Sequence, residues 1–340
     1  MTTWCACCID LHVKNAVEAG ATREELAKAV FIATGLRAGG AVGHGLMALR
    51  LFDHAAAGEA YEAWCGPRAC RRDYRDALSL PSAFSGLRAM HTIDLNSDLG
   101  EGFGRWTMGD DAALLEVVTS ANIACGFHAG DPATIRRTVR RALLHGVALG
   151  AHPSLPDLQG FGRRRMHITA EEAYDLTLYQ IGAVAAFAGA AGGRLHHVKP
   201  HGALYNMAAT DVSLARGIAS AVRDFDPDLV LYGLAGSELT AAGEAVGLAV
   251  ASEVFADRAY RRDGGLVDRG EPGAVIHDET QAVAQALDMV RDRRVLSVDG
   301  VWVPVIPDTI CVHGDTPSAV GLARALRVAL ERAGFSLQPC

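Results

Sequence analysis

The stretch TIDLNSDLGEGFG, residues 92–104, joins a short apolar run to acidic side chains and a glycine-rich end. Its first five residues are rich in the β-branched and apolar types that form buried strands. The polar side chains that it carries are Asp94, Asn96, Asp98 and Glu101. The stretch therefore predicts a strand with chemically capable groups at its carboxyl end.

Six further apolar runs repeat this arrangement along the chain. They are VVTSANIAC (117–125), VALGA (147–151), LHHVK (195–199), LVLYGLA (229–235), LAVASEV (248–254) and TICVHG (309–314). Between them we expect capped helices, one from Asp131-Pro132 to Gly146, one capped by Thr169 with Glu172, and one opening at Thr316-Pro317. Strands that alternate with helices pair in parallel through right-handed crossovers.

The region from residue 91 to residue 340 has the length of a (β/α) barrel, about 250 residues. We predict an α/β fold built as an irregular seven-stranded (β/α) barrel. An open doubly wound sheet is the alternative, but no G-x-G-x-x-G follows the first strand.

The ends of six of the seven strands carry side chains capable of chemistry. Beyond the first strand these are Asn122, Cys125, His128, His152, Lys199, His201, Glu253, Asp257, Arg258, His313 and Asp315, whereas the fifth strand offers only Ser237 and Glu238. Any one of them alone has a structural explanation, and Asp131 and Ser237 are expected to be helix caps. Because the carboxyl ends of barrel strands meet at one mouth, the set together predicts one polar site.

The residue types at this mouth limit its chemistry. Carboxylates and histidines suit general acid/base catalysis or a divalent metal. Lys199, the only lysine after residue 28, offers a compact positive charge or a nucleophile. The glycine-rich segment 257–277 is expected to close over the mouth as a lid. No phosphate-binding G-x-x-x-x-G-K-[ST] occurs, so a nucleotide would bind without a P-loop.

Six motifs of the barrel region, in order, resemble the lactam-utilisation family of 5-oxoprolinase A subunits. They are IDLNSDLGEGFG, SANIACGFHAGDP, GAHPSLPDLQGFGRR, HVKPHGALYN, EVFADRAY and CVHGDTP. Ser97 departs from the cysteine expected there, which argues against an essential thiol at that position. The resemblance implies a barrel of the glycoside hydrolase/deacetylase type. It also implies hydrolysis of 5-oxoproline to L-glutamate, with ATP as co-substrate and subunits B and C as partners.

On this resemblance we assign hypothetical roles to the residues of the mouth. Lys199 and Arg258 would hold a carboxylate or a developing phosphate charge. Proton transfer, or a divalent cation, would fall to His128, His152, His201, Asp94, Asp98 and Glu253. The residues expected to bind substrate are Asn96, Asn122, Asp257, Arg258, His313 and Asp315. The alternatives are a metal-dependent carbohydrate deacetylase on the same barrel and a protein that binds the lactam without turnover.

Residues 1–90 differ in composition from the barrel region. Residues 1–57 predict a small all-α segment, and 58–90 predict a linker rich in Pro, Gly and Arg. The spacing Cys5-x-x-Cys8-x-x-x-His12 and the turn GATREEL resemble part of the carboxymuconolactone decarboxylase/alkyl hydroperoxidase D family. That resemblance implies a thiol peroxidase or redox activity as a further alternative, in a fragment that lacks the family's preceding helical region.

Met90 begins a stretch, MHTIDLNSDLGEGFG, that reads like the natural start of a barrel protein. The first 89 residues are therefore expected to be a gene fusion or a joined upstream frame. The chain has 340 residues, half of them hydrophobic, and a net charge of −7. This composition predicts a globular protein without nucleic-acid partners. No apolar run reaches the roughly 18 residues that span a membrane, and no signal peptide is apparent, so we expect a cytoplasmic location with reduced cysteines.

Overall fold

The computed structural model describes residues 91–314 and 318–340. The predictions for residues 1–90, including Cys5, Cys8 and His12, and for Asp315 lie outside the described residues. Seven parallel strands form a barrel that the pairing of the first with the last closes. In barrel order they are β1 (His91–Leu99), β2 (Ser120–Ala124), β3 (Ala148–His152), β4 (His197–Val198), β5 (Val230–Leu234), β6 (Ala249–Phe255) and β9 (Thr309–Val312). The prediction of a seven-stranded α/β barrel is confirmed.

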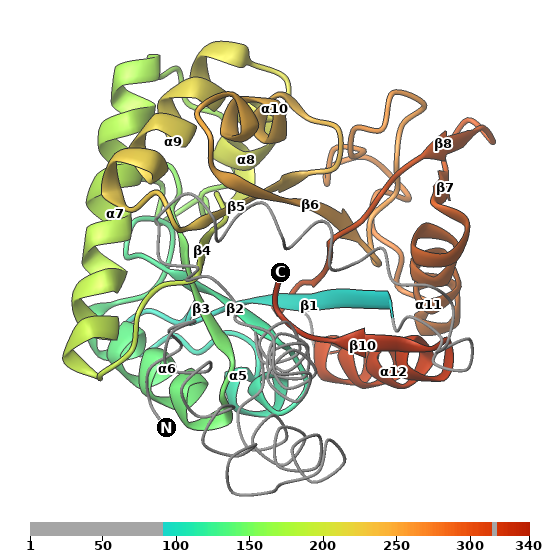
Figure 1. The fold of residues 1–340 in the computed structure, drawn as a ribbon, viewed down its shortest axis with the longest axis horizontal. Helices are drawn as coiled ribbons and strands as arrows, with labels where there is room; N and C mark the ends of the chain where they lie inside the picture. Colours follow the sequence, from blue (N-terminus) through green and yellow to red (C-terminus); the bar gives the residue numbers. More distant parts are fainter. Residues whose placement is uncertain (1–90, 315–317) are drawn as a thin grey trace, which may run out of the picture. The chain divides into compact units, whose positions relative to one another are not determined.

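Helices surround these strands in the ribbon view (Figure 1). They are α5 (Asp111–Leu115), α6 (Pro132–His145), α7 (Ala170–Ala190), α8 (Gly202–Ala208), α9 (Val212–Phe225), α10 (Glu238–Ala245), α11 (Glu279–Leu287) and α12 (Ala319–Arg332), with a π-helical turn η1 (Asp288–Asp292) after α11. Each helix between two barrel strands carries the chain back so that the next strand runs parallel to the last. All carboxyl ends of the strands therefore meet at one end of the barrel.

The helix ends follow the local signals of the sequence. Asp131 caps α6 by accepting hydrogen bonds from the backbone N–H groups of the first turn, and Gly146 ends that helix with a φ of +68°. Thr169 and Glu172 form a capping box for α7, and Ser237 caps α10. The last helix begins at Ala319, whereas the predicted opening residues 316–317 lie outside the described part of the chain.

Three short strands were not predicted. β7 (Arg294–Leu296) and β8 (Trp302–Pro304) form an antiparallel hairpin between η1 and β9. β10 (Phe335–Leu337) pairs in parallel with the first residues of β1, outside the barrel. Each has only three residues, which is too short for an alternating pattern to distinguish a strand from a loop.

Alternate residues of β1 point to opposite sides of the barrel wall. Leu95 and Leu99 are fully buried in the hydrophobic core, which also includes residues of the surrounding helices. Asp94, Asn96 and Asp98 instead hydrogen-bond to residues of other barrel strands. The interior of the barrel is therefore a polar column that leads from the amino ends of the strands to the mouth.

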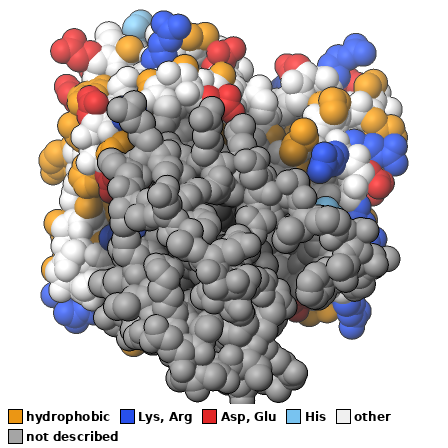
Figure 2. Space-filling model, in the orientation of Figure 1, with side chains coloured by type: hydrophobic (Ala, Val, Ile, Leu, Met, Phe, Trp, Pro, Cys, Tyr) orange, Lys and Arg blue, Asp and Glu red, His pale blue; other side chains and the backbone are white. Residues whose placement is uncertain are grey.

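The surface gives less information about function than the interior. On the face shown in Figure 2, the visible described residues mix acidic and basic side chains. No helix in the described part of the chain has both the length and the apolar character needed to cross a membrane.

Candidate active site

The deepest layer of the polar column is built around Asp94. Four hydroxyl groups donate hydrogen bonds to its two carboxylate oxygens, at 2.5 to 3.1 Å, from Thr119, Ser120, Tyr232 and Thr309. Burial nevertheless raises the pKa of Asp94, because desolvation outweighs these hydrogen bonds. Asp94 therefore joins four elements at the floor of the barrel, below the other predicted catalytic residues.

Lys199 forms the centre of the next layer. Its ammonium group donates to Asp98 Oδ1 at 3.0 Å and lies 2.7 Å from Glu253 Oε1, while Asn96 Oδ1 and Cys311 Sγ are at 3.2 and 3.0 Å. Burial alone would lower the pKa of Lys199, but the neighbouring carboxylates outweigh it and hold this pKa well above the usual value. The lysine is therefore a fixed positive charge at the base of the mouth.

Asp98 links Lys199 to the histidines above it. Desolvation would raise the pKa of Asp98, but His152 and Lys199 together hold that pKa well below the usual value. Asn122 supports this arrangement by donating to both Asp98 and Asn96, at 2.9 and 2.7 Å. Asp98 is thus an anion positioned by hydrogen bonds from two sides.

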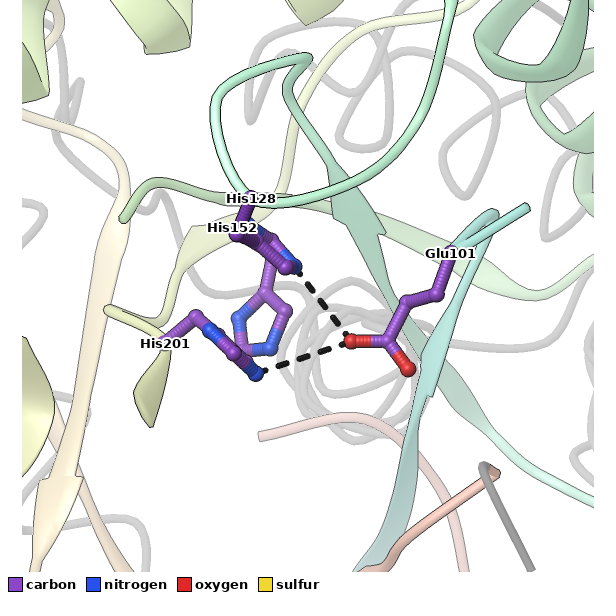
Figure 3. Close-up of side chains that lie close together, drawn as sticks. All are labelled: Glu101, His128, His152 and His201. Carbon is purple, nitrogen blue, oxygen red and sulfur yellow. Dashed lines mark hydrogen bonds and ion pairs between the residues drawn. The ribbon is translucent and has the colours of Figure 1, made fainter. Parts of the chain in front are cut away.

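Three histidines and a glutamate gather beside this network (Figure 3). Nε2 of His128 and Nε2 of His201 lie 3.3 and 3.7 Å from the same carboxylate oxygen of Glu101. The rings of His128 and His201 stack at 3.8 Å, and His152 packs edge-on against both. All four side chains are buried, and their ligand-capable atoms lie within 4.8 Å of one another. This donor set can hold a divalent metal ion.

A second histidine–carboxylate pair comes from the segments that follow β6 and β9. Nδ1 of His313 lies 3.0 Å from Asp257, and the His313 ring stacks on Phe255 at 5.4 Å between centroids. Desolvation would raise the pKa of Asp257, but His313 outweighs it and the pKa is lowered. The hydrogen bond fixes the orientation of the His313 ring, so that this pair can take part in proton transfer.

A cavity of about 480 Å³ opens at the mouth of the barrel. Of the predicted site residues, those that line it are Asp98, His152, Lys199, His201, Arg258 and His313. Four further arginines contribute to its wall, namely Arg163, Arg165, Arg261 and Arg269. The volume suits a small molecule. The five arginines and Lys199 outnumber the carboxylates of Asp98, Asp263 and Asp268 in the lining, which favours an anionic ligand.

The segment 257–277, predicted to be a lid, contributes part of this wall. Arg258 is 3% exposed and donates to the backbone carbonyls of Val267 and Ala274 within the segment, at 2.6 and 3.3 Å. Burial lowers its pKa to about 10, so Arg258 remains charged at neutral pH. The guanidinium therefore holds segment 257–277 together by hydrogen bonds and also contributes a positive charge to the cavity wall.

The other predicted residues lie beneath or beside the cavity. Glu253 and Asn96 contact Lys199 from the barrel interior. Asn122, which lies beside Asp98 in the strand register, accepts a hydrogen bond from His197 at 2.8 Å. His128 is fully buried behind His152 and His201. Their contacts are with other residues of the site, so their proposed roles in chemistry and in substrate binding stay predictions.

Sequence reasoning gives no role to three residues of the site. The sequence places Glu101 at the end of β1 but does not reveal it as a partner of the histidines. Cys311 and His197 occupy inward positions on β9 and β4, where they contact Lys199 and Asn122. The alternation of inward and outward residues in TICV could have identified Cys311, because Thr309 on the same side also enters the network.

The sequence of this chain is similar to those of several known proteins. Residues 93–340 match the model of the LamB/YcsF family. The A subunit of 5-oxoprolinase from Bordetella pertussis (strain Tohama I) is 63% identical over 246 residues, covering 72% of this chain and 98% of that protein. The protein of the same name from Brevibacillus brevis is 58% identical over 248 residues, covering 73% and 98%.

A solved structure shows the same fold. The lactam utilization protein from Thermus thermophilus superposes with a TM-score of 0.69 at 49% sequence identity. The match covers 73% of this chain and 99% of that chain, so nearly the whole of the solved protein corresponds to the barrel region.

Proposed function

The chain belongs to the LamB/YcsF family, and on that premise we propose that it is the A subunit of a 5-oxoprolinase, a hydrolase that opens the lactam of 5-oxoproline to give L-glutamate. The observation that carries the proposal is the cationic cavity at the barrel mouth, in a barrel that matches curated 5-oxoprolinase A subunits over 98% of their length. A small carboxylate-bearing lactam fits both the volume and the charge of this cavity.

The proposal includes ATP as co-substrate and subunits B and C as partners. An unstrained five-membered lactam resists attack by water. Transfer of a phosphoryl group to the lactam oxygen would make the ring carbon electrophilic, so that water can add to it. The C–N bond then breaks, and the ring nitrogen takes up a proton to become the amine. A second water hydrolyses the acyl phosphate that remains, which gives L-glutamate and inorganic phosphate, with ADP left from ATP. The chain has no P-loop motif, so ATP would bind to the complex with B and C without one, with its terminal phosphate reaching the lactam in this cavity.

The contacts of the cavity suggest how its residues divide the work. Arg258 and Lys199 supply positive charge for the substrate carboxylate or the developing phosphate charge. His313, oriented by Asp257, is suited to deliver a proton to the ring nitrogen. On the opposite side of the site, His152 with His128 and His201 would activate water, by proton transfer or by holding a divalent cation, and Asp98 would keep Lys199 in place.

The test is reconstitution of the full chain with subunits B and C, with glutamate release measured in the presence of 5-oxoproline and ATP. We expect Arg258→Gln to raise KM for the lactam at least tenfold. Arg216→Gln provides a matched control, because Arg216 is exposed on α9, away from the cavity. No glutamate from the complete mixture would exclude the proposal, and full activity in Lys199→Ala would exclude the role given to Lys199.

The histidine and glutamate cluster favours a second candidate function, a metal-dependent carbohydrate deacetylase on the same barrel. That enzyme would release acetate from an N-acetyl sugar, would stop when a chelator removes its metal, and would be indifferent to ATP. Assaying the same purified chain on both substrates distinguishes the two functions.

A further inference from the structure

Four buried side chains from four separate segments converge beside the cavity. Glu101 follows β1, His128 follows β2, His152 ends β3 and His201 follows β4. Their exposed fractions are 6%, 0%, 1% and 4%. Bringing four ionisable groups out of water is costly unless each finds a partner that suits its charge.

The hydrogen bonds around the histidines determine which ring nitrogens are available. Nδ1 of His152 lies 2.7 Å from the backbone carbonyl oxygen of Lys199, so this nitrogen carries the proton and donates it. In the neutral ring Nε2 then has a lone pair. This buried atom makes no hydrogen bond of good geometry among the described residues, although Asp98 Oδ2 lies 3.3 Å away. Nδ1 of His201 lies 3.3 Å from the Ser154 hydroxyl, which leaves its Nε2 directed toward Glu101. Metal-binding histidines are typically held in this way by an outer partner.

Neutral imidazoles are the form that binds metals, and burial favours that form here. The rings of His128 and His201 are both buried. Their stacked rings also disfavour two positive charges at 3.8 Å. The cluster thus presents several imidazole nitrogens and one carboxylate oxygen to a common centre.

We propose that Nε2 of His128, His152 and His201 and the carboxylate of Glu101 bind a divalent transition-metal ion of the zinc class. Three imidazoles and one carboxylate form a donor set that suits zinc and its neighbours in the first transition series better than magnesium or calcium, which prefer oxygen ligands. The four side chains already have ligand-capable atoms within 4.8 Å of one another, so small side-chain rotations bring them to one ion.

A neighbouring group of potential ligands provides a contrast. Asp98, Cys311 and His313 also lie close together, but the ammonium of Lys199 is 3.0 Å from both Asp98 and Cys311. The Lys199 ammonium therefore already occupies the place of a cation in that group, which also contains only one imidazole. The metal site is assigned to the Glu101 cluster because three imidazoles surround its single carboxylate.

Two of the ligands, His152 and His201, line the cavity, so the ion would border the space where substrate is proposed to bind. Activation of the attacking water by this ion rests on the proposed function. Binding of the ion does not, because it can be measured without substrate or partner subunits.

The experiment titrates the full chain, stripped of metal by a chelator, with Co²⁺ and follows the visible d–d absorption. We expect the spectrum of Co²⁺ bound by nitrogen and oxygen ligands, with no thiolate-to-cobalt charge-transfer band. That band would identify binding by cysteines such as Cys5 and Cys8. Glu101→Gln and His201→Gln should each lose this absorption, with affinity reduced more than the roughly 10–100-fold that an outer-partner change costs. His167→Gln is the matched control, because His167 is exposed and outside the cluster.

A milder variant keeps the test valid if the ligand variants fold poorly. Ser154→Ala removes only the hydroxyl beside His201 and should weaken Co²⁺ about tenfold. Zn²⁺ should raise the melting temperature of the wild type and of His167→Gln, but not that of Glu101→Gln. Cobalt absorption that is unchanged in Glu101→Gln and His201→Gln, or that shows only thiolate character, would overturn the proposal. Loss of metal binding without loss of lactam hydrolysis would leave the proposed function standing and remove the ion from it.

Discussion

At the scale of single residues, Lys199 is the charge on which the interior of the barrel depends. Replacing it with methionine keeps most of the volume but leaves Asp98 and Glu253 buried without their cation. We expect Lys199→Met to destabilise the barrel by about 3–5 kcal/mol, the usual cost of breaking a buried ion pair from one side. Urea unfolding followed by circular dichroism measures this change.

A second substitution separates the structural role of Lys199 from its chemical role. In Lys199→Met with Glu253→Gln one uncompensated charge is removed, so part of the stability should return. Glutamate release with subunits B and C should stay abolished, because the cavity still lacks the ammonium group. A double variant that regains activity together with stability would show that Lys199 only supports the fold.

The burial of His197 makes the stability of the barrel depend on pH. Its ring is fully buried, donates from Nε2 to Asn122 and stacks on Tyr232 at 4.2 Å. Desolvation lowers its pKa well below the usual value, and the nearby charges of His196, Lys199 and His152 act in the same direction. The unfolded chain therefore binds a proton below about pH 6.5 that the folded chain does not.

The contribution of neutral, buried His197 to the free energy of unfolding is therefore complete above about pH 6.5 and declines as the pH falls below that value. The slope that His197 adds is about 1.4 kcal/mol per pH unit, for one proton. Unfolding free energies measured between pH 7 and pH 5 should fall less steeply in His197→Gln than in the wild type. Parallel curves for the two proteins would contradict the assignment.

At the scale of elements, the loop between β3 and α7 depends on one glycine. Gly162 has a φ of +64°, and an added Cβ would lie 2.2 Å from Ser154 Oγ and 2.8 Å from His128 Cβ. Gly104 has a similar φ of +59° but open space around it. Gly104→Ala should therefore cost about 1 kcal/mol for the left-handed backbone alone.

Gly162→Ala should cost about 1–3 kcal/mol more, because the methyl group overpacks the space beside the histidines. Thermal unfolding of the two variants gives the difference. The same substitution should also reduce glutamate release by displacing His128 or Ser154, whereas Gly104→Ala should retain it. Equal stabilities of the two variants would show that the loop can move to accept the methyl group.

The elements also show which parts of this protein can be predicted from sequence. Short apolar runs located all seven barrel strands, and local capping residues such as Asp131 and Thr169 located helix ends. Convergence at the mouth followed from parallel strand order. The depth of each residue within the barrel could not be predicted. Asp94 and Asp98 belong to the same stretch of sequence, yet Asp94 accepts hydrogen bonds from hydroxyl groups and Asp98 pairs with Lys199. Those differences arise from neighbours on other strands, several of which are more than a hundred residues away in the chain.

At the scale of the whole molecule, the two ends of the described barrel region meet beside its first strand. β1 begins at His91, and β10 pairs with its first residues, so that Phe335 lies beside His91 in the ladder. The backbone carbonyl of Cys340 lies 2.9 Å from Nε2 of His196, next to β4. The segment from residue 91 to residue 340 thus contains both the β1–β9 pairing that closes the barrel and the contacts that hold its last residues against β1 and His196.

This closure, together with a family match that begins at residue 93, leads to a prediction for a shortened chain. A protein of residues 90–340 should unfold in one cooperative transition and, with subunits B and C, release glutamate at the rate of the full chain. The physical reason is that the described residues of the cavity and of the β1–β9 ladder that closes the barrel all lie within this segment. Calorimetry and the coupled assay measure the two properties on the same preparations. A shortened chain that aggregates, or that binds Co²⁺ normally but supports less than about a tenth of the activity, would assign residues 1–89 a part in the working enzyme.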